Sequence, residues 1–565
     1  RSTLFPYTTL FRSPYSYSVS LPEGKWQWAD SNLTRAWSDS ARLIKLRIVS
    51  NGSNKFTELR LFANKLGPAP PIYPAPTAEP PDEGKFFMGY GKLFTDTLLD
   101  DAGYSQRAQA DMGFIDTARN SNGKTILFNK YGNSIAVGYW PAKRNGRKIY
   151  PYFAGPREAF KYPPHYNNDS KDIPIGADST DINSWQAAYN TYYGLVAKLG
   201  HNKNASLKDY NFRNTVQGAG LGVIEEIEIG NEDDARWAGP LRFHNPLVKL
   251  IKLKAGYTAA KAADPNITVI SGALTGIDTS YLKAMYLSNL LRFKTKELPL
   301  DAIAVNEYAT NAGGQHGPTS DGISPEQFKL YEKLKGFITV RNRYYPGKPV
   351  YFTEFGYDVH EGSNYNVPVI RGQSREQTKA FWMIRSMEIA AAARMSKYYQ
   401  YSQKSIGGGD FGTTGFTYDT LLKVPGKQMP AYLHQVMEKH ILEKGGWTTL
   451  PRDLYWYMTM RAKLLEEYNA WPTIIKRGDS TSAWVLKYTH PKDPNKVVYS
   501  IWLGSNKNVS VKNYLLKTGA IREASIVRAE VGKKAGEKIP AQKTGDAVRI
   551  PIIDESVTYV VVQIK

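Results

Sequence analysis

Short apolar runs alternate with longer amphipathic stretches through the central part of the chain, from residue 84 to residue 447. The short runs read as strands, and the longer ones repeat apolar residues at the three-and-four spacing of helices. The strand candidates are 222–230, 266–273, 300–308 and 348–356, and the helix candidates are 184–200, 245–263 and 374–395. This alternation predicts an α/β fold with crossover helices between parallel strands, and its length suits a (β/α)₈ TIM barrel carrying insertions. An open doubly wound sheet is the competing architecture, but no GxGxxG or P-loop sequence opens a helix here.

The pattern changes after residue 447, where apolar and polar side chains alternate along successive short runs. Such alternation is typical of strands that bury one face. The runs are 480–490, 496–504, 547–553 and 556–565. We therefore expect a C-terminal antiparallel β-sandwich over residues 448–565.

Three segments precede the predicted barrel. Residues 1–13 contain TLFPYTTLFRS, which matches the translation of a sequencing-adapter oligonucleotide, and we exclude them from fold prediction as an expected non-native segment. Residues 14–66 end in two strand-like runs around a turn-rich NGSNK. These runs resemble the last strands of discoidin-like, galactose-binding modules, which implies a truncated N-terminal β-module; a generic hairpin explains them equally well. In residues 67–83, seven of seventeen positions are proline, which predicts an extended linker.

Composition narrows the chemistry that the chain can perform. The absence of cysteine removes thiolate nucleophiles and Cys-ligated metals, and eight scattered histidines without an HExxH pair give no support for a metal site, so we expect no cofactor. The net charge of +21 is spread thinly, without a recognition helix, so we expect no nucleic-acid partner. No apolar run approaches the length of about 20 residues that a membrane span needs.

Two acidic residues end predicted strands. Glu232 ends the IEIGNE run, and Glu354 lies in KPVYFTEFG directly before a glycine-containing loop. They lie 122 residues apart, enough for about three βα units, which places them on barrel strands 4 and 7. In a barrel, the carboxyl ends of all strands face one mouth, so the two acids are expected to meet there. Glu228, four residues before Glu232, is expected to point into the barrel and to need a cationic or hydrogen-bonding partner.

The Asn-Glu and Thr-Glu-x-Gly strand ends resemble those of the clan A glycoside hydrolases, which are retaining (β/α)₈ enzymes, and the IEIGNE form is most similar to family 39. Looser likeness extends to uncharacterised bacterial glycosidase-like proteins. The resemblance implies Glu232 as general acid/base and Glu354 as nucleophile. It implies substrate-binding roles for Asn231, Asn306, Tyr308 and Trp237, with Asn231 on the sugar 2-hydroxyl and the Tyr308 hydroxyl orienting the nucleophile.

Two departures from the clan pattern qualify this resemblance. Many relatives carry histidine where this chain has Asn306, and the usual arginine of strand 2 has no clear counterpart, although Arg119 is a candidate. The sequence therefore predicts a retaining glycoside hydrolase that acts on an oligo- or polysaccharide and is secreted, periplasmic or at the cell surface. The alternative is a carbohydrate-binding relative that keeps the barrel and has lost turnover.

Overall fold

The computed structural model describes thirteen stretches of the chain. They are 79–91, 102–109, 125–127, 143, 146–152, 185–212, 218–235, 244–311, 322–402, 404–405, 411–418, 450–479 and 482–565. The predicted adapter segment and N-terminal module, most of the linker, and the residues Arg119 and Trp237 lie outside the described residues.

Eight parallel strands form the centre of the molecule, and their order in the sheet is also their order along the chain. They are β1 (Met88–Gly91), β2 (Ser105–Gln109), β4 (Lys148–Tyr152), β6 (Glu226–Asn231), β7 (Thr268–Ala273), β8 (Ile303–Asn306), β9 (Val350–Phe355) and β10 (Lys397–Gln400). Parallel bridges from Ile270 to Ala302 and from Leu274 to Val305 link β7 to β8 and bring the sheet round into a nearly closed barrel. The predicted (β/α)₈ barrel is confirmed, with Glu232 following the fourth strand and Glu354 in the seventh.

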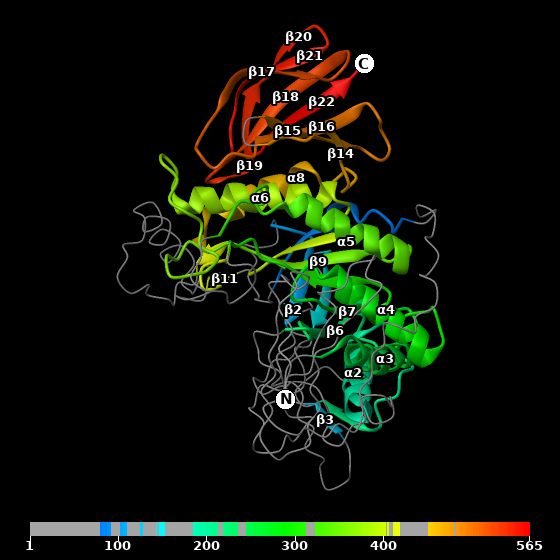
Figure 1. The fold of residues 1–565 in the computed structure, drawn as a ribbon. Helices are drawn as coiled ribbons and strands as arrows, with labels where there is room; N and C mark the ends of the chain where they lie inside the picture. The colour runs from blue at the N-terminus through cyan, green and yellow to red at the C-terminus, as the bar shows by residue number, and fades with distance from the viewer. Residues whose placement is uncertain are drawn as a thin grey trace, which may run out of the picture.

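Helices cover the outside of the barrel (Figure 1). They are α2 (Gln186–Leu199), α3 (Pro246–Ala263), α4 (Thr279–Phe293), α5 (Leu330–Tyr344) and α6 (Arg375–Ala392). The starts of α3, α4 and α6 follow from the sequence, because side chains accept hydrogen bonds from the first free backbone N–H groups. Asn245 caps α3 ahead of a proline at its first position, and Ser374 and Gln377 form a capping box at the start of α6. Two short parallel strands, β3 (Thr125–Leu127) and β5 (Tyr210–Phe212), pair with each other outside the barrel.

The C-terminal region is a β-sandwich, as predicted. One sheet has the order β14 (Thr473–Lys476), β15 (Ala483–Thr489), β16 (Lys496–Leu503), β22 (Thr558–Ile564), β18 (Ile521–Glu530) and β19 (Lys533–Pro540). The other has the order β17 (Val511–Lys517), β21 (Ala547–Ile553) and β20 (Gln542–Thr544). All pairs are antiparallel, and buried aliphatic side chains such as Val497, Ile501 and Ile550 fill the space between the sheets.

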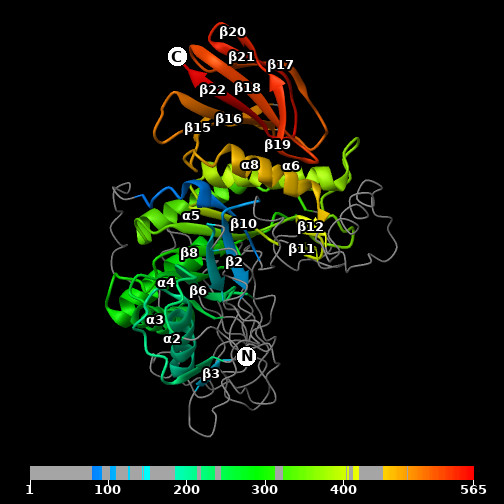
Figure 2. The ribbon, with the colours of Figure 1, turned by 180° about the vertical axis from the view of Figure 1, so that it is seen from behind.

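Helices α6 and α8 (Asp453–Leu464) lie between the barrel and the sandwich, as Figure 2 shows from behind. Just before α8, β13 (Leu450–Pro451) pairs with β12 (Thr417–Tyr418), which in turn pairs with β11 (Lys404–Ser405). The fully buried carboxylate of Glu388 in α6 accepts hydrogen bonds from four donors in this layer. Arg461 Nε lies 2.7 Å away, and the hydroxyls of Tyr488, Ser500 and Tyr559 lie at 2.6, 2.8 and 3.0 Å.

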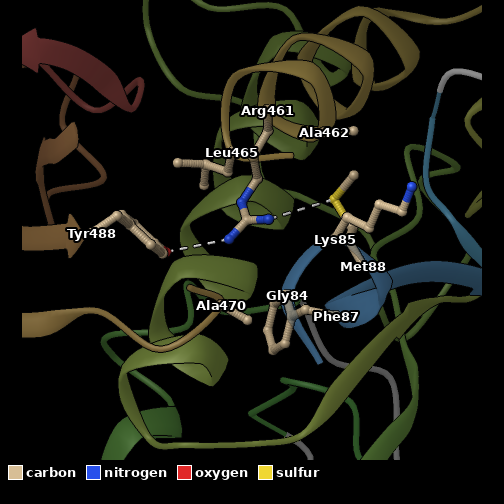
Figure 3. Close-up of a pocket in the computed structure, with 9 residues that line it drawn as sticks. All are labelled: Gly84, Lys85, Phe87, Met88, Arg461, Ala462, Leu465, Ala470 and Tyr488. Carbon is tan, nitrogen blue, oxygen red and sulfur yellow. Dashed lines mark hydrogen bonds between the residues drawn. The ribbon is translucent and has the colours of Figure 1, made fainter. Parts of the chain in front are cut away.

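A small cavity lies beside this layer, at the amino-terminal end of β1 (Figure 3). The short 3₁₀ helix η3 (Gly84–Phe87) and side chains of α8 line it, and Arg461 reaches across it toward Tyr488 and the sulfur of Met88. Its volume of about 20 Å³ is close to the space that one water molecule needs. The cavity is therefore at the opposite end of the barrel from the strand ends that carry Glu232 and Glu354.

Two features are absent from the described part of the chain. No helix in it combines the length and the apolar character that crossing a membrane requires. No group of three or more His, Asp or Glu side chains in it is arranged to hold a metal ion.

Candidate active site

The carboxyl ends of three barrel strands bring the predicted site residues together. Asn231 ends β6 and is followed by Glu232, while Asn306 ends β8 and lies two residues before Tyr308. Glu354 is the next-to-last residue of β9. Because parallel strands of a barrel all end at one mouth, residues more than a hundred positions apart in sequence become neighbours. Trp237, which the resemblance also implies, lies outside the described residues.

Glu354 is held by two donors from different strands. Nη1 of Arg107, in β2, lies 2.6 Å from Oε1, and the Tyr308 hydroxyl lies 2.9 Å from Oε2. Only 7% of Glu354 is exposed, so few water molecules reach the carboxylate and these two contacts dominate its surroundings. Burial, and then the negative charge of Glu354, raise the pKa of Tyr308 well above its ordinary value, so this hydroxyl keeps its proton and donates.

Arg107 is the centre of a buried network that also includes Glu228. Its Nε and Nη2 donate to the two Glu228 oxygens at 2.7 and 2.9 Å, and Nη2 also donates to Oδ1 of Asn231 at 2.7 Å. Its guanidinium carbon lies 3.7 Å from the centre of the Tyr152 ring, which is a stacking distance. Burial alone would lower the pKa of Arg107, but the charges of Glu228 and Glu354 raise it well above the ordinary value. Arg107 is therefore a fixed cation beneath the site.

The partner that Glu228 was expected to need is thus Arg107, and Arg107 is also the strand-2 arginine that sequence analysis did not identify. The candidate Arg119 lies outside the described residues. The pentapeptide of β2, SQRAQ, has no apolar run that would mark it as a strand. The available signal was indirect: a carboxylate pointing into a barrel requires a cation on a strand that faces it.

Glu232 has a different environment from Glu354. Its backbone adopts a left-handed conformation with φ of 51°, which is uncommon for a residue with a Cβ atom. Its N–H donates to the Ala273 carbonyl at 2.8 Å, and its carbonyl accepts from the Ala235 N–H at 2.9 Å. Oε1 of its side chain accepts from Nδ2 of Asn306 at 3.0 Å, a neutral donor in contrast to the arginine that holds Glu354.

A buried cluster of charges supports the backbone just after Glu232. The Asp233 carboxylate accepts from the ammonium groups of Lys249 and Lys252, both in α3, at 2.9 and 2.8 Å. Burial alone would raise the pKa of Asp233, but these two cations lower it far below its ordinary value. The carboxylate of the next residue, Asp234, accepts from the Thr275 N–H at 2.9 Å, which links this turn to the end of β7.

Aromatic rings line the side of the site next to Glu354. The Phe411 ring packs on Tyr308 at 4.7 Å and stacks on Tyr365 at 4.5 Å, and Tyr401, just after β10, meets Tyr308 edge-on at 6.3 Å. Burial, and then the charges of Glu354 and Glu232, raise the pKa of Tyr401, which places this ring near both carboxylates. Sequence analysis did not single out Tyr401 or Phe411, because aromatic residues are frequent throughout the chain.

The chain is similar to known proteins in its structure, whereas sequence comparison finds no match. No protein-family model matches the chain, and no curated protein sequence matches it. Among solved structures, a family 39 glycoside hydrolase from Bacteroides cellulosilyticus WH2 is similar with a TM-score of 0.52 and 14% identity, over 85% of this chain and 81% of that one.

Two family 51 enzymes show a similar likeness. An arabinofuranosidase from Xanthomonas axonopodis pv. citri aligns with a TM-score of 0.51 and 11% identity, over 86% of this chain and 98% of the enzyme. An α-L-arabinofuranosidase from Bifidobacterium longum aligns with a TM-score of 0.50 and 11% identity, over 86% and 97%. At these identities the likeness concerns the fold, and the chain has the (β/α)₈ fold of the clan A glycoside hydrolases.

Proposed function

We propose that this protein is a retaining glycoside hydrolase in which Glu354 is the nucleophile and Glu232 the general acid/base. The observation that carries the proposal is the contrast between the two carboxylates at one barrel mouth. Glu354 accepts from a buried arginine and a tyrosine, whereas Glu232 accepts from the neutral amide of Asn306. A pair of acids in such different surroundings is what glycosidic bond cleavage requires.

The reaction follows two displacements. In the first, the Glu354 carboxylate forms a bond to the anomeric carbon while the bond to the leaving oxygen breaks, and the proton of Glu232 passes to that oxygen. In the second, Glu232, now ionised, takes a proton from water, the water oxygen bonds to the anomeric carbon, and the bond to Glu354 breaks. The electron pair of that bond returns to Glu354. The anomeric configuration is retained because each step inverts it once.

Asn231 and Tyr401 are the proposed sugar contacts beside this pair. Oδ1 of Asn231 already accepts from Arg107, so the Nδ2 end is the one suited to donate to a sugar 2-hydroxyl. Tyr401 offers a ring near both carboxylates, and the apolar face of a sugar packs well on such a ring. We keep Trp237 as a further candidate for the wall of the site.

The rival function is carbohydrate binding without turnover. This function would fit a chain that lacks the arginine of strand 2, because a nucleophile without a basic partner would be poorly positioned. Arg107 supplies that partner at 2.6 Å, which favours the hydrolase. Burying an arginine between two carboxylates is costly because all three charges lose their water. A protein that only binds a sugar would gain nothing from that cost.

The decisive experiment compares the parent protein with Glu354→Gln and Glu232→Gln on a panel of glycosides that includes α-L-arabinofuranosides and pyranosides. We expect the parent to release reducing ends and both variants to lose nearly all activity while remaining folded. Glu361→Gln is the matched control, because Glu361 lies beyond β9 with its side chain 67% exposed. Binding without cleavage by the parent would establish the rival function instead.

Retention is tested separately. Proton NMR of the first product formed from a defined anomer should show the same configuration as the substrate. Azide should restore turnover to Glu354→Ala by replacing the nucleophile, giving a glycosyl azide of inverted configuration. An initial product of inverted configuration from the parent would refute double displacement and leave hydrolysis in place.

We also propose that the protein acts outside the cytoplasm, where polymeric glycans are found. Cell fractionation with an antibody tests this location.

A further inference from the structure

Asn306 contacts the proposed acid/base rather than open solvent. It is fully buried at the end of β8, and Nδ2 donates to Oε1 of Glu232 at 3.0 Å. The same nitrogen lies 3.5 Å from Oδ1 of Asn231, so both of its hydrogens point toward oxygens of β6 and the residue after it. An amide in this position acts on a substrate through Glu232.

The orientation of the Asn306 amide is set by Thr353. The Thr353 hydroxyl lies 2.7 Å from Oδ1 of Asn306 and 3.2 Å from the Val305 carbonyl, and Thr353 is fully buried. With the threonine proton directed to Oδ1, the opposite end of the amide, which carries the hydrogens, faces Glu232. A flipped amide would present an oxygen to a carboxylate oxygen, which is unfavourable whenever Glu232 is ionised.

We propose that Asn306 is the positioning residue of the acid/base, and that its amide holds the Glu232 carboxyl group through Oε1 in the orientation that delivers the catalytic proton. This inference rests on the proposed function. The Asn306 amide is a fixed donor, so the carboxyl group keeps one orientation while its proton passes to the leaving oxygen. The same contact stabilises the carboxylate that remains after transfer.

A chain of hydrogen bonds extends this role to the nucleophile. From Glu354 it passes to Arg107 at 2.6 Å, to Asn231 at 2.7 Å, to Asn306 at 3.5 Å and to Glu232 at 3.0 Å. Between the two carboxylates, every group in this chain is a planar guanidinium or a planar amide. Asn306 therefore also fixes the placement of the acid/base relative to the nucleophile, and its loss should affect proton delivery more than nucleophilic attack.

The test is Asn306→Leu, which keeps the size of the side chain and removes the donor. The first measurement is a carbon-13 NMR titration of the Glu232 carboxyl group, assigned with Glu232→Gln and recorded without substrate. Losing a hydrogen bond to the ionised form should move the midpoint upward by about one pH unit. Asn289→Leu is the matched control, because Asn289 in α4 is equally buried and donates to the Thr295 and Glu297 carbonyls away from the site.

The second measurement uses two glycosides of one sugar, with an alkyl and a dinitrophenyl leaving group. Asn306→Leu should slow the alkyl glycoside at least 10-fold more than the dinitrophenyl glycoside, since the latter needs little protonation. A merely structural defect would slow both equally. Should Asn306→Leu not fold, Thr353→Val takes its place, with the same direction of both effects expected and Thr353→Ser restoring the parent values.

The outcomes separate this inference from the proposed function. If the parent cleaves no glycoside but the titration still distinguishes Asn306→Leu from Asn289→Leu, the proposed function fails and the contact with Glu232 stands. If the parent is active and neither the midpoint nor the leaving-group dependence changes, the role of Asn306 is overturned.

Discussion

Replacing Asp233 by asparagine tests whether buried charge maintains the turn that carries Glu232. Asp233 lies between Lys249 and Lys252 at 2.9 and 2.8 Å, and all three side chains are 2% exposed. The asparagine side chain would keep the shape but remove the negative charge that Lys249 and Lys252 share. Breaking a buried ion pair in this way typically costs about 3–5 kcal/mol, and we expect the free energy of unfolding to fall by that amount.

The pH dependence of this loss follows from the pKa of Asp233. Its value in the folded protein is far below the value of about 3.9 in an unfolded chain, because the two lysines outweigh the effect of burial. A depressed pKa contributes stability that is fully present above the unfolded value and disappears as the pH falls through the folded value. The difference between parent and Asp233→Asn should therefore be constant from pH 5 to 8, as a direct charge effect requires, and should shrink below about pH 4.

Urea unfolding followed by tryptophan fluorescence at several pH values measures both quantities. The matched control is Glu79→Gln, because the ion pair of Glu79 with Arg394 is exposed by more than two fifths on each side. An exposed pair contributes about 0–1 kcal/mol, so the control should stay close to the parent. A loss in Asp233→Asn no larger than that of the control, or one that persists unchanged at pH 3, would refute the reasoning.

Three further predictions concern single side chains. Glu232→Gly should be more stable than Glu232→Ala by about 1 kcal/mol in urea unfolding, since φ of 51° strains any residue with a Cβ atom; equal stabilities would contradict this. Tyr308→Phe should lower kcat/KM about 10- to 100-fold, because it removes a donor to the Glu354 carboxylate; an unchanged kcat/KM would speak against that role. Glu388→Gln should cost about 3–5 kcal/mol by leaving Arg461 buried beside a neutral amide, whereas Tyr559→Phe should cost about 1 kcal/mol, and calorimetry compares the two; similar losses would argue against charge as the cause.

The fold was predictable from the sequence wherever one periodicity persisted. Helix α3 begins at Pro246 and α6 at Arg375, each one residue after the start of its predicted segment, because Asn245 and Ser374 are the caps. The strands β6 to β9 were found because their outward-facing residues are aliphatic and meet the helices. The strands β1, β2, β4 and β10 were not identified, since they are short and the barrel interior that they line contains charged and aromatic side chains.

The candidate site was predictable to the extent that its residues end apolar strands. Glu232 and Glu354 stand out because an acid after an aliphatic run has no packing reason to be there. Arg107 does not stand out, because its partners are 121 and 247 residues away and no local pattern connects them. The function of such a residue is defined by what lies across the barrel, which spacing along the chain does not encode.

Strand register explains why Thr353, an unremarkable residue in the sequence, comes to orient Asn306. Between β8 and β9, Val305 pairs with Phe352 but Asn306 pairs with Glu354, so Thr353 is an extra residue at an irregularity in the ladder. Tyr351 belongs to the cluster inside the barrel and Phe352 to the core around it, so in a regular strand Thr353 would face the interior and Glu354 the helices. Irregularities of this kind re-aim side chains. Here the extra residue turns Glu354 inward to Arg107 while the Thr353 hydroxyl contacts Val305 and Asn306, so one irregularity serves both carboxylates.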